Sequence, residues 1–172
     1  KDVLTNSGFE RFVNSTKMPV ADSMAIKYSA SVNSVHYFSI LPYGLNDKAV
    51  NKTLIGEDTI KGKAYHLIKV TFSEEGGGED YEDVFLYWVN KSTHKVDYLA
   101  YSYNEDDGLG VRFREAYNER YVEGLRFVDY NNYKPADEDH NLFELGRRFD
   151  EDSLKLVSKI ELKQIKVHLI HN

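Results

Sequence analysis

The sequence predicts an α+β protein of mainly antiparallel β-structure, in which a curved sheet or incomplete β-barrel has a helix over residues 23–41 covering one face. Residues 53–133 contain a succession of short segments rich in β-branched and aromatic residues, joined by turns of polar residues and glycine. Between residues 23 and 41, apolar residues recur at every third or fourth position, which is the period of a helix. A length of 172 residues fits a single domain over residues 1–172.

The segment before the β-meander combines a weak strand signal with a helix signal. Residues 9–14 are expected to form a short strand. Asp22 and Ser23 predict a helix cap, because their side-chain oxygens can accept hydrogen bonds from the first turn. We expect the helix in two pieces, since residues 31–34 are poor helix formers, and Pro42 ends it.

The core meander is expected to contain six strands whose apolar residues alternate with a period of two. They are predicted at residues 53–59, 64–73, 82–90, 96–103, 110–117 and 125–133. Their short connections require antiparallel pairing, because a parallel pair needs a crossover of about a dozen residues.

One of these strands, residues 82–90, is apolar on both faces. The two faces carry Val84, Leu86 and Trp88, and Phe85, Tyr87 and Val89, respectively. A strand of this kind is expected to be central and covered on both sides.

After residue 133 the pattern changes. A loop at residues 134–141 is followed by a helical turn or edge strand near residues 142–145 and by a polar stretch at 146–152. A long closing strand is predicted at residues 154–170. Its apolar positions change parity, so we expect a β-bulge or break near residues 163–164.

Composition excludes several classes of protein. The net charge is −6, from 22 basic and 28 acidic residues, and no basic stripe is present, so we expect no nucleic-acid partner. There is no cysteine and therefore no disulfide or thiolate chemistry. No apolar run is long enough for a transmembrane segment. The chain starts at Lys1 rather than Met, which is compatible with the removal of a signal peptide.

The sequence contains no recognisable catalytic or metal-binding motif. Its six histidines form no zinc pattern, its acidic turns lack the spacing of a calcium loop, and neither a phosphate loop nor a hydrolase elbow is present. We therefore predict no catalytic residue, no metal and no cofactor, and expect a protein that is not an enzyme. Paired carboxylates of a glycosidase are defined by their separation in space, so a glycan-active enzyme stays open as an alternative.

The aromatic content, 13 Tyr, 9 Phe and 1 Trp, is the strongest functional signal. One interpretation is packing beneath the helix. The other is an apolar cavity with a few tyrosine hydroxyls, suited to a lipid or another hydrophobic small molecule. Strand parity gives the candidate ligand-binding residues Val84, Leu86, Trp88, Leu99, Tyr101, Phe113 and Phe127.

Three stretches resemble a known family. They are residues 34–47, residues 56–72 with Ile60, Gly62 and Tyr65, and the Tyr87, Trp88 and Val89 strand followed by the turn of Lys91, Ser92 and Thr93. They look like an uncharacterised family of Bacteroidetes envelope proteins of unknown function, often predicted to be lipoproteins. The broader pattern over residues 9–133 and the last strand is similar to the lipoprotein-carrier superfamily, the lipoprotein localisation factors.

This resemblance implies an incomplete antiparallel barrel whose concave side is plugged by helices around a hydrophobic cavity. It implies a non-enzymatic protein of the Gram-negative envelope, periplasmic or outer-membrane-associated, that binds a lipid or acyl chain. The alternative is a structural or interaction module that meets another envelope protein. Folds of that superfamily open with more elements than residues 1–22 provide, which suggests a chain shortened at its N-terminus.

Overall fold

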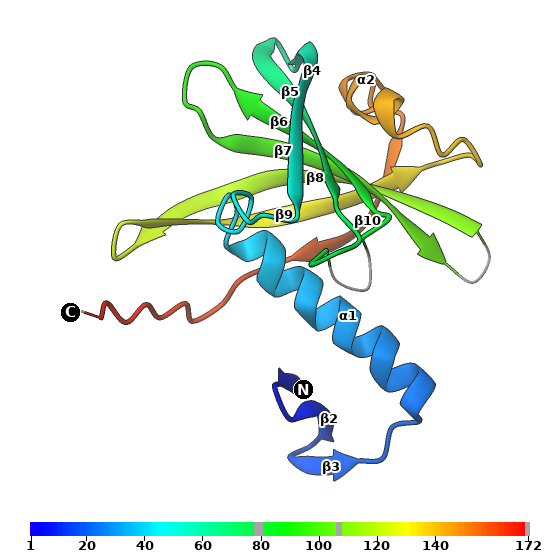
Figure 1. Ribbon diagram of the computed structural model, residues 1–172, viewed down its shortest axis with the longest axis vertical. Helices are drawn as coiled ribbons and strands as arrows, with labels where there is room; N and C mark the ends of the chain where they lie inside the picture. The colour runs from blue at the N-terminus through cyan, green and yellow to red at the C-terminus, as the bar shows by residue number, and fades with distance from the viewer. Residues whose placement is uncertain (78–80, 106–107, 171–172) are drawn as a thin grey trace. The chain divides into compact units, whose positions relative to one another are not determined.

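The computed structural model describes residues 1–77, 81–105 and 108–170 (Figure 1). The chain divides into two compact units, Lys1–Leu41 and Pro42–Asn172, and each is described by itself. The single domain expected from the chain length stays a prediction.

The first unit is a small three-stranded antiparallel sheet with one helix. Its strands are β1 (Asp2–Thr5), β2 (Gly8–Val13) and β3 (Thr16–Met18), of which only β2 was predicted. Helix α1 (Asp22–Ser39) contacts β1 and β2. Arg11 joins the three elements, because its guanidinium binds the Asp2 carboxylate at 2.7 Å and lies 3.7 Å from the centre of the Tyr28 ring.

Two expectations for this helix were wrong. It is one continuous helix of 18 residues rather than two pieces. Its N-cap residue is Ala21, whose backbone carbonyl accepts from Met24 and Ala25, and neither Asp22 nor Ser23 caps it with a side chain. We predicted that residues 23–41 cover one face of the large sheet, and this stays a prediction.

The second unit is built on a seven-stranded antiparallel sheet in the order β10-β9-β8-β7-β6-β5-β4, which leaves β4 and β10 as its edges (Figure 1). Its strands are β4 (Val50–Ile60), β5 (Lys63–Phe72), β6 (Val84–Asn90), β7 (Val96–Glu105), β8 (Gly108–Val122), β9 (Leu125–Pro135) and β10 (Leu154–Ile160). Neighbours along the chain pair antiparallel from β4 to β9, so the predicted meander is confirmed.

The sheet departs from the prediction at two bulges. Strand β8 continues beyond Tyr117 because Asn118 adopts a φ of 50° and a bulge precedes Arg120, which lets pairing with β9 resume. In β10 the register shifts between Leu156 and Ser158 rather than near residues 163–164.

The prediction of a long closing strand at residues 154–170 was wrong beyond Ile160, where β10 ends. The Leu162 N–H donates to Asp129 at 2.9 Å, and the Leu162 carbonyl accepts from Arg120 at 2.6 Å. These side chains bind both backbone groups of Leu162, which are therefore not part of the sheet ladder.

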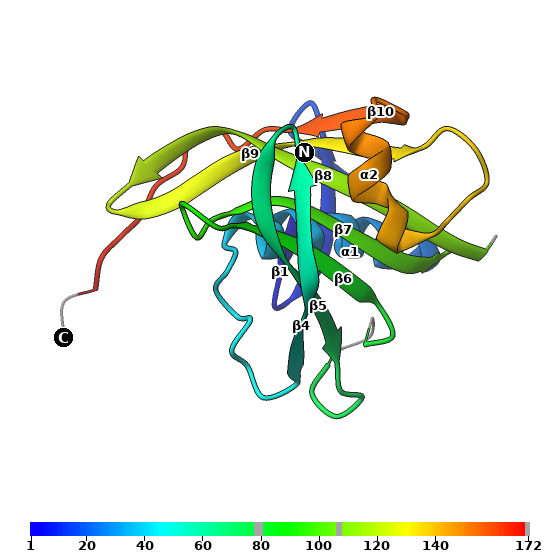
Figure 2. The ribbon, with the colours of Figure 1, turned by 90° about the horizontal axis from the view of Figure 1, so that it is seen from above.

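The core lies between one face of this sheet and the short helices η1 (Leu142–Glu144) and α2 (Leu145–Asp150). Figure 2 shows α2 lying over the sheet. Leu145 and Phe149 pack among Trp88, Tyr98 and Phe113 in one buried cluster. Lys61 holds α2 in place, because its N–H and its ammonium group both bind Asp150. Residues 142–145 are therefore helical and do not form an edge strand. Helix α2 continues to Asp150, into the stretch of residues 146–152 that was described as polar.

Gly146 allows α2 to approach the sheet closely. A Cβ atom at this position would lie 2.7 Å from Cζ2 of Trp88, inside van der Waals contact. The Trp88 indole N–H donates to Asp58 on β4 at 2.7 Å, so the indole is held from both sides.

The opposite face of the central strands is buried as well. Tyr87 is 1% exposed and Leu99 is fully buried, and the two residues pair directly across β6 and β7. The expectation that residues 82–90 form a central strand covered on both faces is confirmed.

Candidate functional site

The seven predicted ligand-binding residues do not share one surface. Val84, Leu86, Trp88 and Phe113 belong to the core face, together with the cluster beneath α2. Leu99 and Tyr101 lie on the opposite face, because they pair with Tyr87 and Phe85 of β6. Phe127 is half-buried on β9, where it pairs with Arg120.

The core face is filled by protein side chains. Leu86, Trp88 and Phe113 are fully buried, and the Phe149 ring stacks on Phe113 with 4.8 Å between ring centres. Simple packing, one of the two interpretations of the aromatic content, describes this face.

The other face carries a layer of aromatic rings, which we call the aromatic layer. It consists of Phe72, Phe85, Tyr87, Tyr101 and Tyr103, whose successive rings have centres 5.5–6.2 Å apart. Offset and edge contacts at such distances are favourable for aromatic pairs. The layer crosses strands β5, β6 and β7. Phe85 and Tyr87 in its middle are buried, and Phe72, Tyr101 and Tyr103 are half-buried.

Two arginines from β8 lie beside these rings. The Arg114 guanidinium is 5.1 Å from the centre of the Tyr101 ring and donates to its hydroxyl at 2.8 Å. Arg112 lies 5.1 Å from the centre of the Tyr103 ring. Apolar rings and cationic groups therefore occur side by side on this face.

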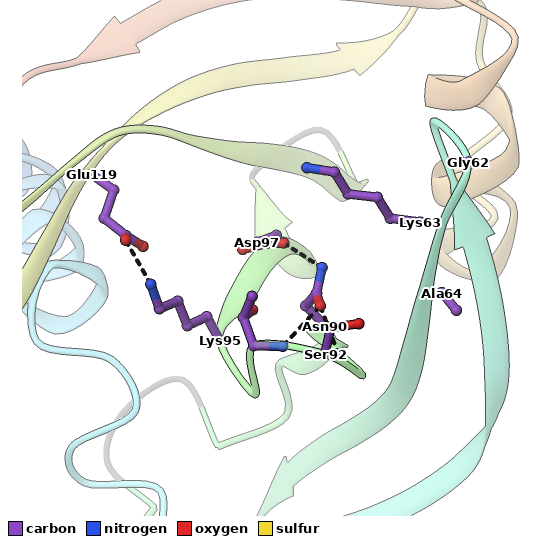
Figure 3. A pocket seen from close by; sticks show the side chains of 9 residues that line it. Gly62, Lys63, Ala64, Asn90, Ser92, Lys95, Asp97 and Glu119 are labelled. Carbon is purple, nitrogen blue, oxygen red and sulfur yellow. Dashed lines mark hydrogen bonds and ion pairs between the residues drawn. The ribbon is translucent and has the colours of Figure 1, made fainter.

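A separate polar groove of about 530 Å³ lies beside the β6–β7 turn (Figure 3). Its lining residues come from the start of β5, the β6–β7 turn, β7 and β8: Gly62, Lys63, Ala64, Asn90, Ser92, Thr93, Lys95, Asp97 and Glu119. A smaller hollow of about 260 Å³ shares Lys63, Asp97 and Glu119 with it.

The floor of the polar groove is fixed by the buried side chain of Asn90. Its Oδ1 accepts from the N–H groups of Ser92 at 2.9 Å and Thr93 at 3.1 Å. Its Nδ2 donates to Asp97 at 3.1 Å, and the Tyr65 hydroxyl donates to the same carboxylate oxygen at 3.3 Å. The turn and its neighbouring carboxylate are thus held in one arrangement before any ligand arrives.

One wall of the groove is an ion-pair network. Glu119 accepts from Lys95 and from Arg126, each at 2.6 Å, and Arg126 lies 3.8 Å from Asp97. The hydrogen bonds from Lys95 and Arg126 hold the pKa of Glu119 below its ordinary value. Glu119 is therefore ionised near neutral pH, and its charge is neutralised by the two cations.

Lys63 differs from the other cations of the groove. Within the described ranges, its ammonium group has no hydrogen bond or ion pair to another side chain. Figure 3 shows the side chain extending over the groove, across from Asn90 and Lys95. Lys63 is thus a cation without an ion pair beside a wall whose Lys95 and Arg126 are paired.

Sequence reasoning found the turn at residues 91–95 but not this groove. Its side chains come from four separate segments and match no motif. The one local signal was Asn90 followed by Ser92, since an Asn side chain readily accepts from the N–H two residues on.

A profile described as "Family of unknown function (DUF6503)" matches residues 1–162. The chain belongs to this family. No curated protein and no solved structure gives a match.

The DUF6503 match includes both compact units and ends at Leu162, the residue bound by Asp129 and Arg120. Membership of an uncharacterised family is thus confirmed. Among the described residues of this DUF6503 protein, no helix is both long and apolar enough to span a membrane.

Proposed function

We propose that this DUF6503 protein is a non-enzymatic protein of the Gram-negative envelope, periplasmic or outer-membrane-associated, that binds a hydrophobic ligand such as a lipid or acyl chain. The aromatic layer carries the proposal, because it places apolar rings, tyrosine hydroxyls and two arginines on one sheet face. An acyl chain would lie against the rings, and an acidic head group would bind Arg112 or Arg114. The resemblance to the lipoprotein carriers supports the envelope location.

The lowered pKa of Glu119 favours binding over glycan hydrolysis. A glycosidase needs a carboxylic acid that keeps its proton near neutral pH, so the pKa of that acid must be raised. The pKa of Glu119 is shifted in the opposite direction by Lys95 and Arg126. This carboxylate is therefore a poor proton donor.

The experiment compares a fatty acid with the fatty alcohol of equal chain length by calorimetry. We expect the acid to bind more tightly and Arg112→Gln to remove most of that difference, whereas Lys155→Gln, an exposed control on β10, leaves it unchanged. Native mass spectrometry of gently purified protein would look for the natural ligand. A protein that binds neither compound and carries no lipid would refute the proposal.

A brominated acyl chain tests where the ligand lies. Trp88 is the only tryptophan in the sequence and lies on the core face, across the sheet from the aromatic layer. A chain on the aromatic layer should therefore quench Trp88 fluorescence weakly. Strong quenching would place the ligand in the core cluster instead.

A second candidate function, an interaction module, is favoured by the edge strand β4. Leu54 is 63% exposed and Ile55 39% exposed, and β4 is an edge strand of the sheet that the described residues form. Such an edge can pair with a strand of another envelope protein. Light scattering and a pull-down with Thr53→Pro as the control would test it. A monomer with no retained partner would count against this role.

A further inference from the structure

The polar groove has the properties of a second ligand site, distinct from the aromatic layer. We propose that it binds a saccharide carrying a single carboxylate, such as a uronic acid unit of a glycan. The lining groups that lead to this class of ligand are hydroxyls, amides, carboxylates and one unpaired ammonium group.

The mixture of donors and acceptors suits a sugar. Ser92 and Thr93 supply hydroxyls, and Asn90 and Asp97 supply an amide and a carboxylate around the same space. The adjoining hollow adds the side chains of Tyr98 and Tyr117. Sugars present many hydroxyls, each able to donate and accept, together with C–H faces that pack on aromatic rings.

The groove is also pre-organised. Asn90 fixes the turn through Ser92 and Thr93, and Asp97 is held by Asn90 and Tyr65. Polar groups that are already held lose little conformational freedom when a ligand binds, which favours affinity for a small polar molecule.

The single unpaired cation favours a monoanion. Lys95 and Arg126 bind Glu119, and Arg126 also lies beside Asp97, so these four groups balance one another. Glu115 of the adjoining hollow offsets Lys63 in the total charge, and among the described residues Lys63 is the lining cation without an ion pair. A phosphate group would carry close to two negative charges at neutral pH, and the carboxylates of Asp97 and Glu119 on the same walls would repel it more strongly. A single carboxylate on a largely neutral ligand can pair with Lys63 and is repelled least by these carboxylates.

Calorimetry with galacturonic acid, which carries one carboxylate, and its methyl ester tests the proposal. The ester has the same shape and hydroxyls but no charge. We expect the acid to bind more tightly than the ester. Lys63→Gln should lower the affinity for the acid about threefold to tenfold and leave the affinity for the ester unchanged. Lys155→Gln is the matched control, because it removes one lysine charge outside the groove. Added salt should reduce the preference for the acid.

Three results would overturn the inference: no binding of either sugar, equal affinity for acid and ester, or an unchanged affinity for the acid in Lys63→Gln. Lys63 lies on a strand end and is exposed, so its substitution is compatible with folding, and circular dichroism checks this. The fatty-acid measurements depend on Arg112 and the aromatic layer. Failure at one site therefore leaves the result at the other intact.

Discussion

Gly146→Ala tests the close packing of α2 on the sheet. In a helix, alanine is normally more favourable than glycine by about 1 kcal/mol, so this change should stabilise an ordinary helix. Here the new Cβ would lie 2.7 Å from Cζ2 of Trp88 and 3.0 Å from Oδ2 of Asp58. The indole and its hydrogen bond to Asp58 must then shift, although Trp88 is fully buried.

The expected result is a net loss of stability. Overpacking of a filled core costs about 1–3 kcal/mol. Partial loss of the hydrogen bond between Trp88 and the Asp58 carboxylate adds on the order of 1 kcal/mol, and helix propensity returns a similar amount. Gly146→Ala should therefore lower the free energy of unfolding by about 1–3 kcal/mol, with Tm falling about 2–4 °C for each kcal/mol.

Urea unfolding followed by circular dichroism measures this, and a double-mutant cycle with Trp88→Phe isolates the contact. Phenylalanine has no Cζ2 atom at the clash, so in that background Gly146→Ala should become neutral or stabilising. Stabilisation of the wild-type chain by Gly146→Ala, or an equal cost in both backgrounds, would contradict the close contact between residue 146 and Trp88.

Three further changes have expected outcomes. The pKa of buried Asp129 is lowered, because hydrogen bonds from Asn118, the Leu162 N–H and Arg120 outweigh its desolvation. Its stabilisation is therefore present above the unfolded-state pKa of about 3.9 and is lost as the pH falls through the folded value. Asp129→Asn should cost about 2 kcal/mol at neutral pH and less in acid, and equal costs at both pH values in urea melts would contradict this. Arg148 is mostly buried and binds Asp137 at 2.7 Å, so Arg148→Ala should speed proteolysis at residues 136–141, whereas exposed Arg147→Ala should not. Truncation after residue 160 should lower Tm by more than truncation after residue 162, since only the latter keeps Leu162 bound to Asp129. Equal Tm values would show that this anchor is unimportant.

The strands were predictable where alternation and turn residues agreed. Residues 64–73 and 125–133 show both signals, and β5 and β9 coincide with them to within two residues at each end. The extension of β8 was not predictable in the same way, because Asn118, Glu119 and Arg120 are typical of a loop and pair only through a bulge. The length of helix α2 was underestimated, because its outward residues are polar and hide the core residues Leu145 and Phe149 in the sequence pattern.

The candidate sites could not be predicted in full, because they depend on how the strands pair and not on the sequence of any one strand. The division of residues 82–90 into two faces was predicted correctly. Which residues of β7 lie on each of these faces depends on the register between β6 and β7. The register places Leu99 opposite Tyr87 and Tyr101 opposite Phe85, so these two predicted site residues lie away from Trp88. The polar groove required Lys63, Asn90 and Glu119 to meet across the sheet, which no local pattern indicates.

Burial of β6 on both faces has a consequence for motion. Opening this strand requires both layers of side chains to separate, so its backbone amides should exchange with solvent only when the whole unit unfolds. Backbone amides of the turns and the edge strands should exchange through smaller, local openings. The polar groove begins at Asn90, the last residue of this strand, and is therefore attached to the stiffest part of the sheet. A ligand there would meet a rigid wall on one side and, in Lys63, a side chain free to close over it.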